Sequence, residues 1–381
     1  MTDLSRRRAL GLLMAGSLTG AALPRPAFAQ GVEGRTLIFV ILRGAMDGLA
    51  ALIPDDREID TLRGSILPEP ATRLDLGNGF RLHPALSALK DLYQAGEAGF
   101  VHASATAYRD RSHFDGQDRL ETLAPPGTRD GWLNRATGAL GGQALAVGYA
   151  LPLALKGPAP ARNWAPAVFE PASEDLAMRL QDLYAGDPLL AEALATARAM
   201  PAPETDLAGQ GGPRGIPYAA TLQAMGDLMA APDAPGIGMV SLEGWDTHAN
   251  QAPALQARFT QLGLGLSRLK TALGPKWATT CVVMCSEFGR TAAANGTRGT
   301  DHGIGGLTVL AGGAVAGRQV HGDWPGLSPR DLYEGRDLAP ANAVEAVLKG
   351  VLRDHLGLPR AVLDSELLPG SPRALDGLIA A

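Results

Sequence analysis

The stretch Thr36-Leu37-Ile38-Phe39-Val40-Ile41-Leu42 is a run of β-forming, almost wholly apolar residues that leads straight into Arg43-Gly44-Ala45-Met46-Asp47-Gly48. The run is too short for a typical helix, so it predicts a strand buried on both faces, as in a parallel sheet. The turn that follows places Asp47 just beyond the carboxyl end of this strand. Because open α/β sheets bind ligands beyond the carboxyl ends of their strands, a functional site is expected at this edge.

The rest of the chain alternates between strand and helix patterns. Further strands are predicted at 99–103, 237–242, 280–285 and 307–311, and helices at 82–93, 252–273 and 342–356. This alternation predicts an α/β fold of three layers, with a mostly parallel sheet covered on both faces by helices. Residues 151–235 are rich in Pro and Ala, with helical patches at 174–184, 188–199 and 216–230 and a Gly/Pro linker at 203–216. We therefore predict one domain over 30–381 with a mainly helical insert at about 151–235.

Composition excludes several classes of function. The 381 residues carry a formal net charge of -5 and show no basic stripe, which argues against nucleic-acid binding. The chain has two cysteines, Cys281 and Cys285, in one predicted strand. At roughly 3.3 Å per residue they lie about 13 Å apart on the same face, too far for a disulfide, so both are expected to be buried small hydrophobes.

The first 29 residues have the pattern of a twin-arginine signal peptide. Arg6-Arg7-Arg8 precedes an apolar stretch over 9–23, and Ala27-Phe28-Ala29 matches a cleavage site. A retained membrane anchor is the alternative, but the stretch is short and contains Gly and Ser, which favours cleavage. We expect export by the twin-arginine machinery, with no stable membrane insertion afterwards and a periplasmic or extracellular location. Export in the folded state suits a protein that acquires a metal first.

Acids and histidines gather in three segments that follow or precede predicted strands: Gly244-Trp245-Asp246-Thr247-His248, Ser286-Glu287-Phe288-Gly289-Arg290-Thr291 and Thr300-Asp301-His302-Gly303. Two of only seven histidines lie here. One residue separates Asp246 from His248, so both side chains face the same way in an extended segment. The alternative is that Asp246 caps a helix and His248 lies at the surface. Oxygen and imidazole donors without thiolate suit one or two divalent ions of Zn, Mn, Fe or Ca.

Other candidate ligands each have a structural alternative. Glu287 directly follows an apolar strand, where an acid is unfavourable unless it binds a cation or pairs with Arg290. His302 lies in a glycine-rich loop and is either a ligand or a turn histidine, while Asp301 either ligates or orients His302. Asp47 is a ligand or the cap of the following helix.

The segment Arg111-Ser112-His113-Phe114-Asp115 supplies a hydroxyl, an imidazole and charges within five residues. Ser112 is a candidate nucleophile if a neighbouring base or metal removes its proton. The alternative is a helix start with Ser112 as N-cap and Asp115 three residues later. Arg43, Arg111 and Arg290 are candidates to hold an oxyanion such as phosphate or sulfate in a bidentate manner.

Taken in order, these motifs resemble the bacterial family catalogued as domain of unknown function 1501, over nearly the whole mature chain. Leu310-Ala311-Gly312-Gly313-Ala314-Val315 also fits that family. At greater distance the chain is similar to the alkaline phosphatase and sulfatase superfamily. That resemblance implies an alkaline-phosphatase-like fold with one or two metals at the carboxyl ends of the strands.

The resemblance also implies roles. Asp47 and Glu287 would hold one metal and Asp246, His248 and His302 the other, with Ser112 as nucleophile and Ser104 or Thr106 as alternatives. The implied activity is an exported metal-dependent hydrolase acting on phosphate or sulfate esters, small or polymeric. No Cys lies near Arg111-Ser112, so the formylglycine of typical sulfatases cannot form. The second hypothesis is an exported, non-catalytic metal- or oxyanion-binding protein of an envelope or polysaccharide-associated assembly.

Overall fold

A computed structural model describes residues 34–165, 174–184, 186–199 and 217–380, so the predicted signal peptide at 1–29 and linker at 203–216 lie outside the described residues. The described chain contains a nine-stranded sheet in the order β11-β5-β10-β9-β1-β8-β6-β7, with β12 paired to β5. Its strands are β1 Thr36–Leu42, β5 Ala98–Ala105, β6 Ala144–Val147, β7 Ala161–Trp164, β8 Ile237–Leu242, β9 Thr280–Cys285, β10 Gly306–Ala311, β11 Val320–His321 and β12 Asn342–Ala343.

The predicted mostly parallel sheet is confirmed, with one reversed strand. β1 pairs in parallel with β8 and β9, whereas β10 runs antiparallel to both β9 and β5. β9 and β10 are joined by the loop 286–305 with no crossover helix, which permits an antiparallel pair. β10 therefore starts at the edge where its neighbours end, and the loop before it meets the loops that follow β1, β8 and β9.

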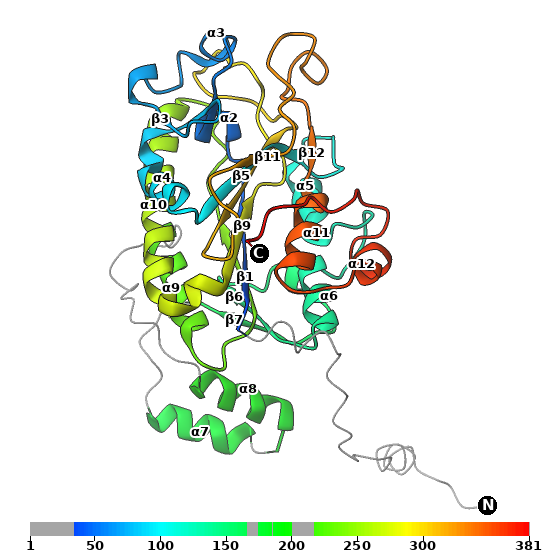
Figure 1. Cartoon of the computed structure of the whole chain (residues 1–381). Helices are drawn as coiled ribbons and strands as arrows, with labels where there is room; N and C mark the ends of the chain where they lie inside the picture. The colour runs from blue at the N-terminus through cyan, green and yellow to red at the C-terminus, as the bar shows by residue number, and fades with distance from the viewer. Residues whose placement is uncertain (1–33, 166–173, 185, 200–216, 381) are drawn as a thin grey trace, which may run out of the picture.

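Helices cover both faces, which confirms the three layers (Figure 1). One face carries α4 Ser87–Ala95, α9 Tyr218–Ala230 and α10 Gln251–Leu273, and the other carries α5 His113–Thr122, α6 Trp132–Ala139, α11 Val344–Asp354 and α12 Arg360–Val362. Side chains of β1 alternate between the two cores: Ile38, Val40 and Leu42 face the first set of helices, and Leu37, Phe39 and Ile41 face the second. Burial on both faces explains the unbroken apolar run.

The helix predicted at 82–93 begins later than expected. Leu82 ends β4 Phe80–Leu82, which pairs with β2 Leu52–Pro54 and β3 Leu74–Asp75 in a small antiparallel sheet. A 3-10 turn at Pro84–Leu86 follows, and α4 starts only at Ser87. Pro84 is the physical reason, because it biases His83 toward extended backbone and so separates Leu82 from the helix. In sequence, the short helix α2 Gly48–Ala51 lies between β1 and β2, and the short helix α3 Ile59–Arg63 lies between β2 and β3.

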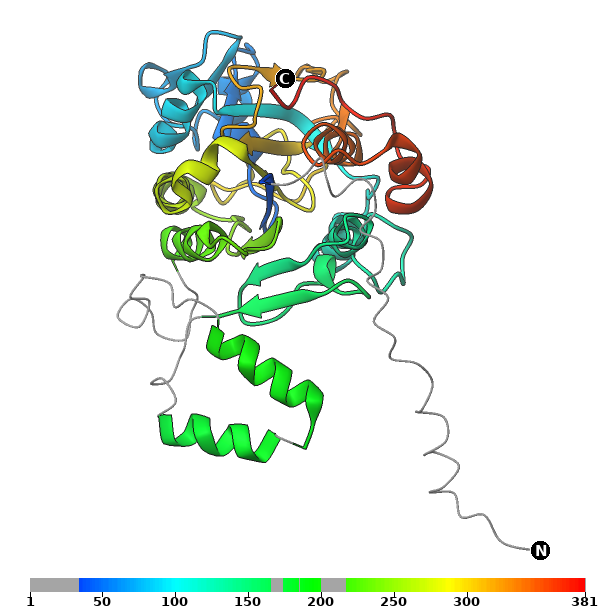
Figure 2. The same ribbon diagram turned by 60° about the horizontal axis from the view of Figure 1, so that its bottom comes forward.

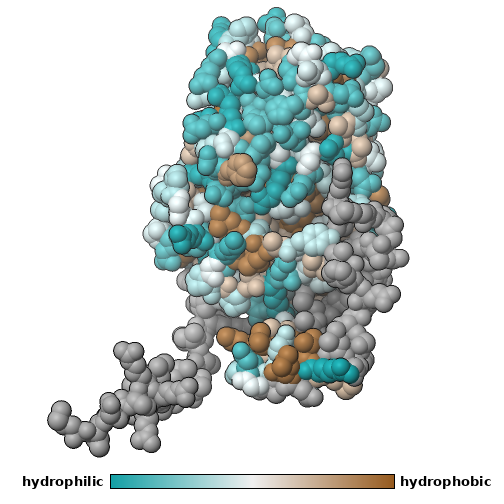
Figure 3. Space-filling model, turned by 180° about the vertical axis from the view of Figure 1, so that it is seen from behind, coloured by the Kyte–Doolittle hydropathy of each residue, from teal (hydrophilic) through white to brown (hydrophobic). Residues whose placement is uncertain are grey.

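Two elements inside the predicted insert at 151–235 belong to the main layers. β7 extends the large sheet beyond β6, and α9 packs along α10. The strands β6 and β7 were both missing from the sequence prediction. Each has only four residues and no long apolar run, and β7 carries the polar residues Arg162 and Asn163. α7 Glu174–Tyr184 and α8 Pro188–Ala199 match the predicted helical patches and pack on each other away from the sheet (Figure 2). They expose large apolar side chains at Met178, Leu183, Leu189 and Leu190, in a region that is partly apolar in Figure 3.

Both cysteines are buried and unbridged, as expected, and burial raises the pKa of the Cys281 thiol to about 12. Across the described ranges, no helix combines the length and apolar character needed to cross a membrane.

The loop 286–305 folds back on itself where two glycines meet. Gly303 N donates to Gly289 O at 2.9 Å, and Gly289 N donates to Ile304 O at 3.0 Å. A Cβ on Gly289 would lie 1.9 Å from Gly305 O, and a Cβ on Gly303 would lie 2.3 Å from Arg290 C, so neither position has room for a side chain. This close approach fixes the position of the residues between 300 and 303.

Gly289→Ala is therefore expected to destabilise the protein by about 1–3 kcal/mol or more, because the clash is with backbone. Urea unfolding measures the change. Gly296→Ala is the matched control from the same loop, since a Cβ there meets nothing within 4 Å. Equal midpoints for the two variants would contradict the proposed close packing.

A buried histidine on β5 predicts acid sensitivity. His102 Nε2 donates to Leu52 O at 2.8 Å, Nδ1 accepts from Ala103 N at 2.8 Å, and burial lowers the pKa of this ring to about 4. Below pH 6.5 the unfolded chain binds a proton that the folded ring does not, so stability falls as the pH falls from about 6.5 to about 4.

His102→Gln should flatten the dependence of the unfolding free energy on pH in that window, where one such histidine accounts for up to about 3 kcal/mol. The comparison is made by urea unfolding of both proteins at pH 7, 6 and 5. His83, whose pKa burial also lowers to about 4, keeps part of the slope in the variant. An unchanged slope would show that His102 does not contribute.

Candidate metal centre

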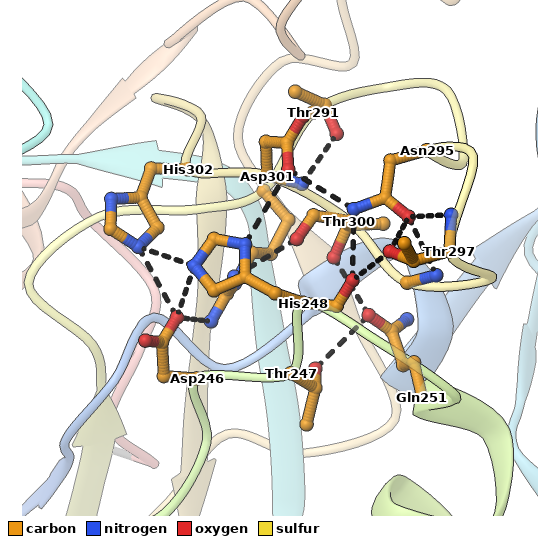
Figure 4. A network of polar contacts seen from close by, with 12 residues as sticks. Asp246, Thr247, His248, Gln251, Thr291, Asn295, Thr297, Thr300, Asp301 and His302 are labelled. Carbon is orange, nitrogen blue, oxygen red and sulfur yellow. Dashed lines mark hydrogen bonds and ion pairs between the residues drawn. The ribbon is translucent and has the colours of Figure 1, made fainter.

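Four polar side chains from three segments meet beyond the carboxyl edge of the sheet. Asp246 and His248 lie in the loop after β8, His302 lies in the loop before β10, and His113 is the first residue of α5. The reversed direction of β10 brings His302 to this edge. Figure 4 shows the rings of His248 and His302 turned toward the carboxylate of Asp246.

Asp246 is the centre of this cluster. Its Oδ1 lies 2.9 Å from His248 Nε2 and 3.2 Å from His302 Nε2, and those two nitrogens are 3.0 Å apart. Its Oδ2 lies 3.5 Å from His113 Nε2. One donor atom each from His113, Asp246 and His302 can be chosen so that all three lie within 4.8 Å of one another. The two oxygens of Asp246 thus face histidines on different sides.

Each histidine of the cluster has an acceptor behind it. His113 Nδ1 lies 2.7 Å from Glu287 Oε1, His302 Nδ1 lies 2.9 Å from Arg111 O, and His248 Nδ1 lies 3.4 Å from Asp301 Oδ1. Carboxylates and carbonyls only accept, so Nδ1 carries the hydrogen in each of these contacts. In a neutral ring the bare Nε2 lone pair then faces the Asp246 carboxylate, an arrangement that needs a cation or a proton between the two atoms. Such a partner behind the ring is typical of metal-binding histidines.

The pKa shifts of Asp246 and His302 also suit a cation. Burial raises the pKa of Asp246, but the bond from Arg290 and the neighbouring positive charges outweigh burial and lower it overall. Burial is the main cause that lowers the pKa of His302. An anionic carboxylate and a neutral imidazole are the forms that bind metals. Two neutral rings with Nε2 atoms at 3.0 Å repel unless a proton or a cation lies between them.

Glu287 was expected to ligate a metal, but the structure places it behind His113. Its Oε1 also accepts from Gly44 N at 2.9 Å and Gln117 Nε2 at 3.2 Å. Burial raises the pKa of Glu287, but these bonds, above all that from His113, lower it overall, and the bond to Glu287 raises the pKa of His113. His113 Nε2 is buried without a hydrogen-bond partner. A buried polar atom without a partner costs about 1–3 kcal/mol, which favours a ligand at that nitrogen.

Arg290, expected to hold a substrate oxyanion, is a buried link between loops. Its Nε donates to Ala45 O at 2.7 Å, and its Nη2 donates to Gly44 O at 2.6 Å and to Asp246 Oδ1 at 2.6 Å. Its Nη1 donates to Thr300 O at 3.2 Å. The guanidinium therefore fixes Asp246 and is not turned to solvent.

Asp47 is not brought to the cluster. Its Oδ2 accepts from the buried Arg63 at 2.5 Å and from Gln251 at 2.6 Å, and its Oδ1 caps α2 at Ala50 N. The structural alternative, a helix cap, thus describes its position, with a buried ion pair in addition. The Gln251 amide oxygen accepts from the hydroxyls of Thr247 and Thr300, which connects Asp47 indirectly to the loops of the site.

Arg111 contributes its backbone rather than its guanidinium. Two acids bind the side chain, Asp337 at 2.8 Å and Glu334 at 2.6 Å, while its carbonyl oxygen holds His302. Its φ of 60° is left-handed, an uncommon conformation for a residue with a side chain. Strained backbone of this kind clusters at functional sites, and here the two ion pairs hold the carbonyl toward His302.

Of the candidate hydroxyls, Ser112 is the one beside the cluster in sequence. It occupies the N-cap of α5 directly before His113, but its side chain makes no cap hydrogen bond. Ser104 Oγ pairs with Thr308 Oγ1 at 2.9 Å between strands, and Thr106 Oγ1 accepts from Tyr108 N at 3.3 Å. These two are engaged in the sheet and its following loop.

Asp301 takes the orienting position that the sequence allowed, but toward a different ring. It faces His248 rather than the adjacent His302, and Asn295 Nδ2 donates to its Oδ1 at 3.0 Å. Its bond from Asn295 is the main cause that lowers its pKa.

Sequence reasoning missed His113 as a candidate ligand. The signal that could have found it is its place in the loop that follows β5, beside the same sheet edge as the other histidines. Its neighbours Ser112 and Asp115 instead led to the prediction of a catalytic serine or of a helix start at this segment. The contact with Glu287, from 174 positions away, becomes visible only in the folded chain.

The fold and the site define a three-layer α/β protein with a candidate histidine and aspartate metal centre at the carboxyl edge of its sheet. The chain belongs to the family described as "Protein of unknown function (DUF1501)", whose sequence model matches residues 119–366. The matched range contains Asp246, His248 and His302 and begins six residues after His113.

Several solved structures resemble the chain at a distance. The C-terminal periplasmic domain of EcEptC from Escherichia coli in complex with Zn is 11% identical, with 73% of this chain and 72% of that chain covered and a TM-score of 0.36. A protein in the alkaline phosphatase superfamily from Vibrio parahaemolyticus is 12% identical, with 76% and 62% covered and a TM-score of 0.39. The lipoteichoic acid synthase LtaP from Listeria monocytogenes is 8% identical, with 91% and 78% covered and a TM-score of 0.39. A search of the curated proteins finds no match.

The cluster predicts how metal affinity responds to substitution. Asp246→Ala should abolish stoichiometric binding because it removes the shared carboxylate, and Glu287→Gln should weaken binding by about 10–100-fold because it loosens His113. Zinc titration by calorimetry and elemental analysis of the purified proteins measure both. His321→Gln, a histidine outside the cluster, is the control and should bind as the wild type does. Wild-type binding no tighter than that of Asp246→Ala would exclude a metal centre here.

Proposed function

We propose that this chain is an exported, metal-dependent hydrolase that acts on phosphate or sulfate esters. The observation that carries the proposal is the arrangement of three histidines whose Nδ1 atoms face acceptors and whose Nε2 atoms converge on Asp246. The twin arginines and the cleavage motif within residues 1–29 support export.

The donor set fits a divalent transition metal. Metal–ligand bonds of about 2.0–2.2 Å place neighbouring ligand atoms about 3–3.5 Å apart, and the triangle of Asp246 Oδ1, His248 Nε2 and His302 Nε2 has sides of 2.9, 3.0 and 3.2 Å. Imidazole donors favour Zn or Fe, and Mn accepts the carboxylate, whereas Ca prefers oxygen alone. Among the predicted ions, Ca is therefore the least suited.

Openness of the site supports catalysis rather than a purely structural role. The side chains of Asp246 and His248 are 40% and 44% exposed, whereas structural metal sites are closed by protein ligands. A divalent cation at such a site supplies Lewis-acid chemistry, which lowers the pKa of a nucleophilic hydroxyl or water and polarises an ester oxygen.

The chain's own residues have separate tasks in this proposal. Glu287 and Arg111 hold the rings of His113 and His302 in one orientation, and Arg290 holds Asp246. Phe288 stacks on His113 at 5.0 Å between ring centres and keeps water from that side of the ring. The hydroxyl of Ser112, with no cap bond of its own, is the proposed nucleophile.

One observation favours the alternative of a non-catalytic metal-binding protein. The three arginines expected to hold an oxyanion already have protein acceptors: Arg43 bonds Gln117 and Glu121, Arg111 bonds Asp337 and Glu334, and Arg290 bonds backbone carbonyls and Asp246. The negative charge of an ester substrate would then be neutralised by the metal cation alone. A binding protein of an envelope or polysaccharide-associated assembly would have no such need.

Turnover of p-nitrophenyl phosphate and p-nitrophenyl sulfate by metal-loaded protein separates the two functions. The hydrolase proposal expects saturable turnover that falls by at least about 100-fold in Asp246→Ala. Ser112→Ala should abolish turnover if the serine attacks and retain part of it if water attacks. Stoichiometric metal with no turnover on a broad panel of esters would favour the binding protein.

A further inference from the structure

A second pocket lies at the other end of α5, away from the metal centre. It has a volume of about 260 Å³ and is formed by the end of β5, the C-terminal half of α5, the start of α11 and the segment 369–372. Arg119, on its wall, comes six residues after His113 on the same helix, which corresponds to about 9 Å along the axis. The volume is just below the roughly 300–1,000 Å³ that small-molecule sites span, so any occupant is small.

Arg119, on the wall of this pocket, has N–H donors that lack a close hydrogen-bond acceptor. Its Nε is buried and has no hydrogen-bond partner, and its Nη2 lies 3.5 Å from Glu345 Oε1, beyond ordinary hydrogen-bond length. A guanidinium has five N–H donors in a fixed plane, and a buried N–H that is left without an acceptor is unfavourable. The chain therefore holds a poorly satisfied fork at the wall of a cavity.

The surroundings of Arg119 favour an anion. Arg109 is a second guanidinium on the lining, and one of its nitrogens bonds the carbonyls of Thr106 and Tyr108. Glu345 is the acidic residue on the lining, and its Oε1 also accepts from Ala107 N at 3.3 Å. Two positive charges against one negative charge leave a net positive pocket. The lining hydroxyl of Thr106 can donate a further hydrogen bond, whereas that of Ser371 already donates to Leu368 O at 2.6 Å.

We propose that this pocket binds a small oxyanion-bearing molecule, with the carboxylate or phosphoryl group on the fork of Arg119. Guanidinium recognises both groups through paired N–H donors, which is why the chemistry of the occupant is an oxyanion rather than a cation or an apolar group. This site is separate from the metal centre and does not depend on catalysis there.

Thermal unfolding with inorganic phosphate and with propionate, at constant ionic strength, tests the site. Asp246→Ala serves as the parent protein, so that no anion binds through the metal centre. A saturable rise in unfolding temperature is expected with at least one of the two probes, and Arg119→Gln in the same background should raise the dissociation constant at least tenfold. Phosphate and propionate responses distinguish a phosphoryl from a carboxylate ligand.

Arg119→Lys and Arg109→Gln keep the test decisive if Arg119→Gln does not fold. Lysine keeps the charge but loses the planar fork, so weaker binding is expected, and Arg109→Gln should also weaken binding. The matched control is Arg129→Gln, which alters an arginine outside the pocket lining and should bind as the parent does. A shift that never saturates, or one that persists unchanged in the Arg119 and Arg109 variants, would overturn the proposal.

Discussion

The buried guanidinium of Arg290 is the interaction on which the site depends. It donates to the carbonyls of Gly44, Ala45 and Thr300 and to the carboxylate of Asp246, so one side chain joins the loops after β1 and β8 and the loop before β10. A buried charge of this kind is tolerated only when its donors are satisfied, which makes the three loop conformations mutually dependent. The same charge lowers the pKa of Asp246 and so keeps its carboxylate ionised in a half-buried position.

The direction of one strand decides which loops can take part. Eight strands of the sheet share one direction, and β10 alone opposes them. If β10 followed its neighbours, the loop carrying His302 would open at the far edge of the sheet. The glycine contact between Gly289 and Gly303 then folds that loop back so that Arg290 and His302 form an antiparallel bridge. Backbone topology therefore places the candidate ligands at one edge of the sheet.

The charges around the cluster are arranged in two layers. Asp246 and the Nε2 atoms of three histidines form the inner one, and Glu287, Asp301 and the Arg111 carbonyl form the outer one behind Nδ1. The outer acceptors select the tautomer that leaves Nε2 free, and the ion pairs of Arg111 with Glu334 and Asp337 hold that carbonyl in a left-handed turn. Many of the polar side chains at this edge thus bond to other side chains or to backbone rather than face solvent, and Glu287, Arg111 and Arg290 are among them.

The sequence by itself determined the main strands, the helices that cover them and the edge at which Asp246, His248 and His302 lie, because burial on both faces and helical periodicity leave local patterns. It left open whether Glu287, Asp47 and Asp301 bind a metal or hold other residues in place. A carboxylate beside a strand gives the same sequence pattern in either case. Only the tertiary structure decided that Asp47 pairs with Arg63, that Glu287 stands behind His113 and that His113 joins the cluster. Those outcomes depend on contacts between side chains that are 16 and 174 positions apart in the sequence. Such contacts form only when α3 packs beside the start of α2 and the start of α5 packs beside the end of β9.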